Sequence, residues 1–145
     1  MRLPLSVLLF SLLMISCNNN PEKKTTLVSN QNTNVNINQP PVTTVQWLDS
    51  SLSFNNIKEG TLVDISFRFV NTGENPLVFS DVEASCGCTI AEKPELPIAP
   101  GKQGTIKATF NSSGRLGTNH KTLTAYLNTE EKSHSLTFDV NVISK

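Results

Sequence analysis

The sequence predicts an all-β fold, an antiparallel β-sandwich of about seven strands over residues 44–145, preceded by a disordered N-terminal tether. Hydrophobic residues in this region alternate with polar ones over several short runs, which is the period of a strand with one buried face. Turn-forming residues separate the runs, as they do in sandwiches. No window of comparable length has the period of an amphipathic helix.

Five alternating runs support this prediction in chain order. They cover residues 63–69, 77–79, 106–110, 123–127 and 136–142. Asn71-Thr72-Gly73 and Asn75-Pro76 predict a turn after the first run. Pro100-Gly101 predicts another turn before the third run, because glycine is free to adopt positive φ.

The first residues are typical of an export signal. Arg2 precedes an apolar run, Leu3–Ile15, which is shorter than the ~20 helical residues that span a hydrocarbon core. The ending L-M-I-S-C resembles a bacterial lipoprotein cleavage box, although Met14 stands where leucine is usual. We expect residues 1–16 to be removed and Cys17 to be acylated, for example with palmitate, as the new N-terminus. An ordinary signal peptide cut elsewhere is the alternative.

Residues 17–43 are rich in asparagine, contain no aromatic residue and have only isolated aliphatic residues. Such a segment buries too little apolar surface to offset the entropy of ordering it, so we predict a flexible tether. Without Arg2 the chain has 11 basic and 12 acidic side chains. This near-neutral balance lacks the basic clusters that bind nucleic acid.

Several sequence stretches, in the order in which they occur along the chain, resemble those of a bacterial family of exported proteins, domain of unknown function 1573. The matching stretches are F-N-N-I-K-E-G (54–60), F-R-F-V-N-T-G-E-N-P-L (67–77), S-C-G-C-T (85–89), P-I-A-P-G-K-Q-G-T-I (97–106), F-N-S-S-G-R-L-G (110–117) and K-T-L-T (121–124). The resemblance implies an immunoglobulin-like sandwich, akin to domains of cilia and centrosome proteins, with no established activity. Family members are commonly lipoproteins, which agrees with the predicted anchor.

The S-C-G-C-T stretch holds Cys86 and Cys88, separated by Gly87. An exported compartment permits a disulfide. Fully extended, the two Cα atoms lie about 6.6 Å apart, at the limit for a disulfide, and a kink at Gly87 brings them within range. A disulfide that closes so small a ring removes little conformational entropy from the unfolded chain. A bond here would therefore suit a redox or conformational latch better than a structural staple. Between neighbours it cannot join the two sheets.

The other chemistries have weaker support. Soft thiolates select Cu(I) or zinc, but only His120 and His134 are available as further soft ligands, and nothing in the sequence brings them to the cysteines. A nucleophilic cysteine needs an adjacent, oriented base, and no such arrangement is evident. Ser112–Thr118 lacks the Lys-Ser/Thr of a phosphate-binding loop. We therefore predict no enzyme activity, no metal site and no cofactor.

The sequence thus predicts a lipid-anchored, extracytoplasmic protein of the bacterial cell envelope that works as a binding or scaffolding module. Its expected partners are the membrane, through Cys17, and an envelope protein or glycan. The choice between inner and outer membrane stays open. The favoured interpretation of Cys86 and Cys88 is a close-packed turn, bonded or not, and the alternative function is thiol redox or copper handling by this pair.

Overall fold

The computed structural model describes residues 39–145. The predicted signal peptide, Cys17 and most of the predicted tether lie outside the described residues. Within residues 39–145, no helix is long and apolar enough to cross a bilayer.

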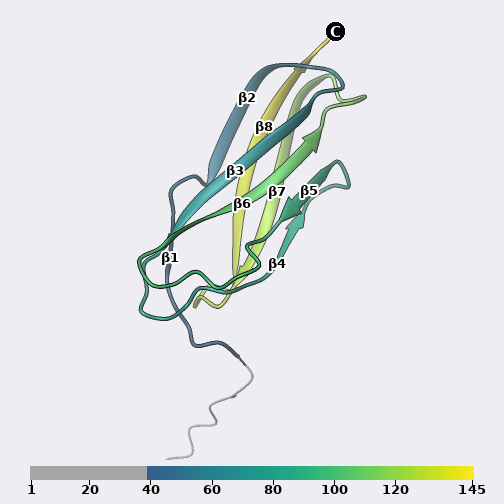
Figure 1. Cartoon of the computed structure of the whole chain (residues 1–145). Coiled ribbons are helices and arrows are strands. Elements are labelled where there is room, and N and C mark those ends of the chain that lie inside the picture. The colour runs from purple at the N-terminus through teal and green to yellow at the C-terminus, as the bar shows by residue number, and fades with distance from the viewer. Residues whose placement is uncertain (1–38) are drawn as a thin grey trace, which may run out of the picture. The chain divides into compact units, whose positions relative to one another are not determined.

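The described residues form eight strands in two four-stranded sheets packed face to face (Figure 1). The strands are β1 (Val45–Trp47), β2 (Ser51–Lys58), β3 (Leu62–Asn71), β4 (Phe79–Ala84), β5 (Thr89–Glu92), β6 (Gln103–Asn111), β7 (Gly117–Leu127) and β8 (Ser133–Ile143). The first sheet has the order β1-β3-β6-β5 and the second has the order β2-β8-β7-β4. The all-β sandwich is confirmed, with eight strands in place of about seven.

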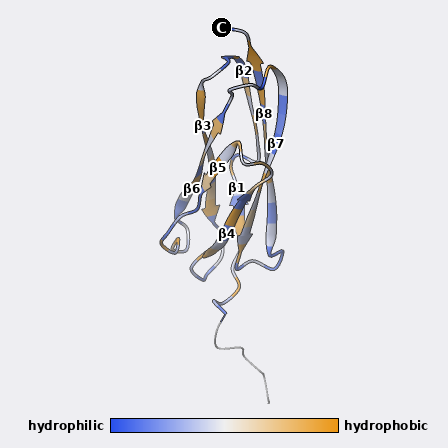
Figure 2. Cartoon of the chain, turned by 90° about the vertical axis from the view of Figure 1, so that its right-hand side faces the viewer, coloured by the Kyte–Doolittle hydropathy of each residue, from blue (hydrophilic) through white to orange (hydrophobic). Residues whose placement is uncertain are grey.

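The predicted alternation places the core between the sheets. Along β3, four alternate side chains are at most 7% exposed, namely Val63, Ile65, Phe67 and Phe69. Figure 2 shows hydrophobic and hydrophilic segments alternating along the strands. Aromatic pairs join the two sheets, since the ring centroids of Phe69 and Phe79 lie 4.9 Å apart and those of Phe110 and Phe138 lie 6.0 Å apart. Tilted and edge-to-face ring contacts of this kind add to the stabilisation from buried apolar area.

One strand pair departs from the predicted antiparallel arrangement. β2 runs parallel to β8, whereas the other strand pairs of the two sheets are antiparallel. The reason is that β1 and β2 form one edge segment that runs in a single direction and changes sheet at residues 48–50. A bulge between Phe54 and Ile57, with Asn56 at φ 57°, breaks the alternation of β2.

The folded domain begins before the predicted boundary at residue 44. Thr43 is 4% exposed and its hydroxyl donates to Asn71 Oδ1 at 3.0 Å. Its backbone N–H donates to the carbonyl of Asn128 at 3.0 Å. Gly73 makes room for this contact, because a Cβ there would overlap the Thr43 hydroxyl. Thr43, assigned to the tether from sequence, is therefore part of the domain.

The turn predicted at Pro100-Gly101 is confirmed. Gly101 has φ 70°, and the Lys102 N–H donates to the Ala99 carbonyl at 3.0 Å. This hydrogen bond closes a four-residue turn that needs positive φ at its third residue, and glycine meets that need without a steric penalty.

Candidate functional site

The C-G-C sequence lies in the loop between β4 and β5, where the chain passes from one sheet to the other. β4 is the edge strand of the second sheet and β5 is the edge strand of the first. Hydrogen bonds hold both ends of the loop. The Ser85 N–H donates to the Thr122 carbonyl at 2.9 Å, and the Thr122 N–H donates to Ser85 Oγ at 3.1 Å. At the other end, the Asn111 N–H donates to the Cys88 carbonyl at 2.9 Å.

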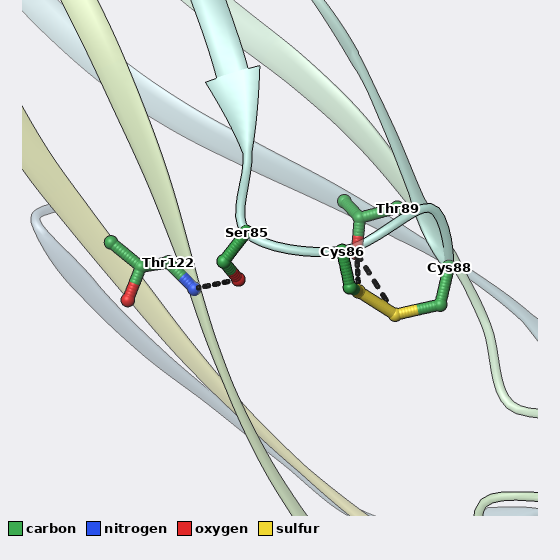
Figure 3. The surroundings of a disulfide bond; sticks show 5 residues. All are labelled: Ser85, Cys86, Cys88, Thr89 and Thr122. Carbon is green, nitrogen blue, oxygen red and sulfur yellow. Dashed lines mark hydrogen bonds between the residues drawn. A yellow bond between two sulfur atoms is a disulfide. The ribbon is translucent and has the colours of Figure 1, made fainter.

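A disulfide joins Cys86 and Cys88 within this loop (Figure 3). Their Cα atoms lie 5.2 Å apart, inside the usual range for bridged cysteines, so the backbone bends at Gly87. A hydrogen bond of 3.2 Å from the Thr89 N–H to the Cys86 carbonyl closes the bend. The bond stays within one loop and does not staple the sheets together.

The two sulfur atoms share one hydroxyl but differ in burial. Thr89 Oγ1 lies 3.8 Å from Cys86 Sγ and 3.9 Å from Cys88 Sγ. Because disulfide sulfurs carry no proton, the hydroxyl is the donor, and its single proton is shared between the two contacts. Cys88 is 7% exposed and belongs to the core, whereas Cys86 is half-buried at its margin. The ring thus presents one sulfur-bearing residue toward the solvent and hides the other.

The two histidines have partners of their own. His120 lies on the exposed face of β7, as its alternation predicts, with Nδ1 2.7 Å from Asp139 Oδ1. His134 Nδ1 lies 3.3 Å from Trp47 Nε1, and its Nε2 lies 2.9 Å from Thr129 Oγ1. The indole N–H can only donate, so Nδ1 accepts and Nε2 carries the proton. Within residues 39–145, no three His, Cys, Asp or Glu side chains gather as a metal-binding group.

A groove of about 370 Å³ lies beside the start of the described chain. Its lining comes from the start of the described chain, from the beginning of β4 and the residue before it, and from the end of β7 and the loop that follows. Val42, Val78 and Leu127 are apolar members from these three places. A second hollow of about 310 Å³, on the outer face of the first sheet, is lined by polar side chains that include Asp64, Glu92 and Lys107. Sequence reasoning missed both, because their linings combine short stretches that are far apart in the chain.

Two exposed charged contacts shift pKa values. The hydrogen bond from Arg68 holds the pKa of Asp49 below its usual value, and Asp49 in turn raises the pKa of Arg68. Two guanidinium nitrogens of Arg68 meet the two carboxylate oxygens at 2.6 and 3.0 Å. On β7, the Tyr126 hydroxyl donates to Glu83 Oε2 at 3.2 Å, and this contact raises the pKa of Tyr126.

The edge strands differ in how far their outer backbone groups are covered. On β4, the Asp81 carboxylate accepts the Val82 N–H at 2.8 Å, and Lys93 Nζ donates to the carbonyls of Phe79 and Ser80 at 3.2 and 2.7 Å. Side chains therefore occupy much of this edge. Covering an edge in this way is a common protection against unwanted strand pairing.

The edge of β2 is open by comparison. The Ser50 carbonyl accepts the Thr137 N–H at 2.9 Å, which fixes the residues of β2 that bond to β8. In a parallel ladder, the alternate residues Ser51 and Ser53 then direct their backbone N–H and C=O groups away from β8. Among residues 39–145, these groups have no hydrogen-bond partner. This open edge belongs to the strand whose parallel pairing sequence reasoning missed.

Comparisons with solved structures find the same sandwich in several proteins. A protein of unknown function from Porphyromonas gingivalis W83 has 11% identity and a TM-score of 0.62, with 70% of this chain and 48% of that chain covered. The chain thus spans about half the length of that protein. PapD-like domain 7 of human CEP192 has 14% identity and a TM-score of 0.55, with coverages of 74% and 89%. The E. coli chaperone DraB has 8% identity and a TM-score of 0.53, with coverages of 70% and 57%.

At these identities the likeness is one of fold, and it identifies the architecture as immunoglobulin-like or PapD-like. No curated protein sequence matches the chain. The family model described as "Protein of unknown function (DUF1573)" matches residues 45–142. This range includes the whole C-G-C loop and all eight strands except the last residue of β8. The chain therefore belongs to the DUF1573 family.

Proposed function

We propose that the chain is a non-enzymatic binding or scaffolding module of the bacterial cell envelope, anchored to a membrane by lipid on Cys17. The support for the anchor is the sequence, in which the apolar run Leu3–Ile15 ends at L-M-I-S-C. A lipid anchor gains about 0.8 kcal/mol for each buried methylene group. The Asn-rich tether then separates the domain from the membrane surface.

The observation that supports binding is the open edge of β2. Ser51 and Ser53 direct backbone N–H and C=O groups outward over a stretch where the strand is regular. An extended peptide recognises such an edge by adding a strand to the sheet. Of the two partner classes expected from the sequence, this edge favours an envelope protein, because a glycan has no alternating N–H and C=O groups. The fold likeness to a chaperone agrees with a binding role.

A proline substitution tests the edge. Ser53→Pro removes one outward N–H and leaves the hydrogen bonds to β8 in place, since proline is tolerated at solvent-facing positions of edge strands. Ser53→Ala is the matched control, because it removes the hydroxyl and keeps the N–H. A photocrosslinking amino acid at position 51, in cells of the source bacterium, reports contact with a partner.

We expect a discrete protein adduct from position 51 that Ser53→Ala retains and Ser53→Pro abolishes. The same crosslinker at Lys107, on the outer face of the first sheet, provides the comparison for chance encounters. An adduct that survives Ser53→Pro, or equal adducts from positions 51 and 107, would contradict binding through this edge.

The anchor has a separate test. Labelled palmitate supplied to the cells is expected to appear on the wild-type chain and not on Cys17→Ser. Absence of label from the wild type would contradict the lipid anchor, and it would leave the test of the β2 edge unaffected.

A further inference from the structure

The disulfide ring joins a half-buried cysteine to a buried one, with a buried threonine hydroxyl beside both sulfurs. Cys86 is half-buried, and Gly87, at the tip of the ring, is exposed. A Cβ built on Gly87 would meet no atom within 4 Å, so the space beside the ring is open. We propose that Cys86–Cys88 is a thiol–disulfide exchange site that accepts electrons from a dithiol of a partner protein.

Burial determines which sulfur is attacked. Cys88 is 7% exposed and packs in the core, so an incoming thiolate reaches Cys86 Sγ first. Cys88 Sγ is then the leaving group. Exchange depends on access to the attacked sulfur and on the stability of the leaving thiolate, and the structure provides for both.

Thr89 stabilises the leaving thiolate. Its hydroxyl lies 3.9 Å from Cys88 Sγ, and Thr89 is itself 6% exposed, so the donor is held in place next to the sulfur (Figure 3). A hydroxyl hydrogen bond is stronger to a charged acceptor than to a neutral one. The contact therefore strengthens as negative charge develops on Cys88.

The loop is built to open without unfolding. Hydrogen bonds at Ser85 and Cys88 fix its two ends to β7 and β6, and none of these bonds involves sulfur. The ring closes a separation of only two residues, so the bond restricts the unfolded chain less than a long-range disulfide does. Reduction is thus expected to cost little stability.

The exchange balances in two steps. A partner thiolate attacks Cys86 Sγ, the bond between the two sulfurs breaks, and its electron pair goes to Cys88 Sγ, which takes up a proton. The second partner thiolate then attacks the partner sulfur of this mixed disulfide, and Cys86 leaves as a thiol. The partner dithiol is oxidised to a disulfide and the Cys86–Cys88 pair is reduced to two thiols.

The test uses the full chain with Cys17→Ser, in which Cys86 and Cys88 are the only cysteines. Dithiothreitol serves as the dithiol probe, and alkylation with mass spectrometry counts free thiols over time. We expect complete reduction under native conditions with an unchanged circular dichroism spectrum. Thr89→Val is expected to slow reduction about fivefold, the effect of losing one ordinary hydrogen bond. Thr89→Ser keeps the hydroxyl and is expected to restore the rate.

Single-cysteine variants test the order of attack. With oxidised glutathione, the Cys86 thiol left by Cys88→Ser is expected to form the mixed disulfide at least about tenfold faster than the Cys88 thiol left by Cys86→Ser, because reactivity follows exposure. Equal rates would overturn the assignment of Cys86. A wild-type disulfide that persists in excess dithiothreitol while the protein stays folded would overturn the proposal, and this measurement needs no variant.

Discussion

Two short connections join edge strands of different sheets, one on each flank of the sandwich, and they are fastened by different chemistry. Residues 48–50 link β1 to β2, and the ion pair between Asp49 and Arg68 holds them. Residues 85–88 link β4 to β5, and the Cys86–Cys88 disulfide lies within them. The same topological step thus carries an exposed ion pair on one flank and a disulfide on the other.

The difference has a consequence for function. A solvent-exposed ion pair contributes little to stability and weakens with salt, whereas a disulfide is permanent until a thiol reaches it. The β1–β2 flank also carries the open edge of β2, and the β4–β5 flank carries an edge covered by Asp81 and Lys93. The two proposed roles, partner binding and thiol exchange, therefore lie on opposite flanks, so they can be disturbed separately.

The largest effect is expected from Trp47→Ala, which removes the packing next to the first connection. The indole ring is half-buried and meets Phe69 edge-on, with the ring centroids 5.5 Å apart. We expect a loss of about 2–4 kcal/mol in the free energy of unfolding, at the lower end for a large aromatic residue because Trp47 is partly exposed. Urea unfolding followed by circular dichroism measures it.

Trp47→Phe is the control for this prediction. It keeps an aromatic ring to pack against Phe69 and removes the N–H that His134 accepts together with part of the indole surface, so about 1–2 kcal/mol is expected. Equal losses for the two variants would show that the hydrogen bond, and not the packing, holds the first connection.

A smaller effect is expected on the other flank from Cys86→Ala/Cys88→Ala. Loop-closure entropy for so short a ring predicts a loss of about 1–2 kcal/mol. Wild-type protein unfolded in dithiothreitol is expected to lose a similar amount, which separates the bond from the side chains. A loss as large as that of Trp47→Ala would mean that the disulfide is a main support of the fold.

The smallest effect is expected from Asp49→Asn. Arg68 lowers the pKa of Asp49, so the ion pair stabilises the fold at pH values above the ordinary aspartate pKa of 3.8 and is lost as pH falls through the lower folded value. The melting temperature of the variant is expected to lie slightly below that of the wild type at neutral pH. This difference in melting temperature is expected to disappear at low pH and in high salt. A difference that is independent of both would exclude an electrostatic origin.

The sequence predicted the regular parts of the sandwich because burial on one face fixes a period of two. Val63, Phe67 and Phe69 on β3 alternate without interruption, and the turn at Pro100-Gly101 has residues with strong conformational preferences. These signals are local, so a single sequence reveals them.

The edges could not be predicted in the same way. In β2 the bulge at Asn56 shifts the alternation between Phe54 and Ile57, and β1 is only three residues long. The parallel pairing with β8 depends on contacts between opposite ends of the chain. The S-C-G-C-T motif indicated Cys86 and Cys88 as candidate site residues. The position of this pair between the two sheets and the role of the Thr89 hydroxyl depend on tertiary structure.

The contact between Thr43 and Asn71 has a mechanical consequence. A pull on the N-terminal segment reaches the domain first at Pro41 and Val42, whose carbonyls accept hydrogen bonds from the side chains of Asn128 and Asn75. It then reaches Thr43, where both the side chain and the backbone are hydrogen-bonded to the domain. The short pairing of β1 with β3 comes next along the chain, and β2 follows after it. A pulling force would therefore break these early contacts first, and the strand edge at Ser51 and Ser53 would stay folded in the meantime.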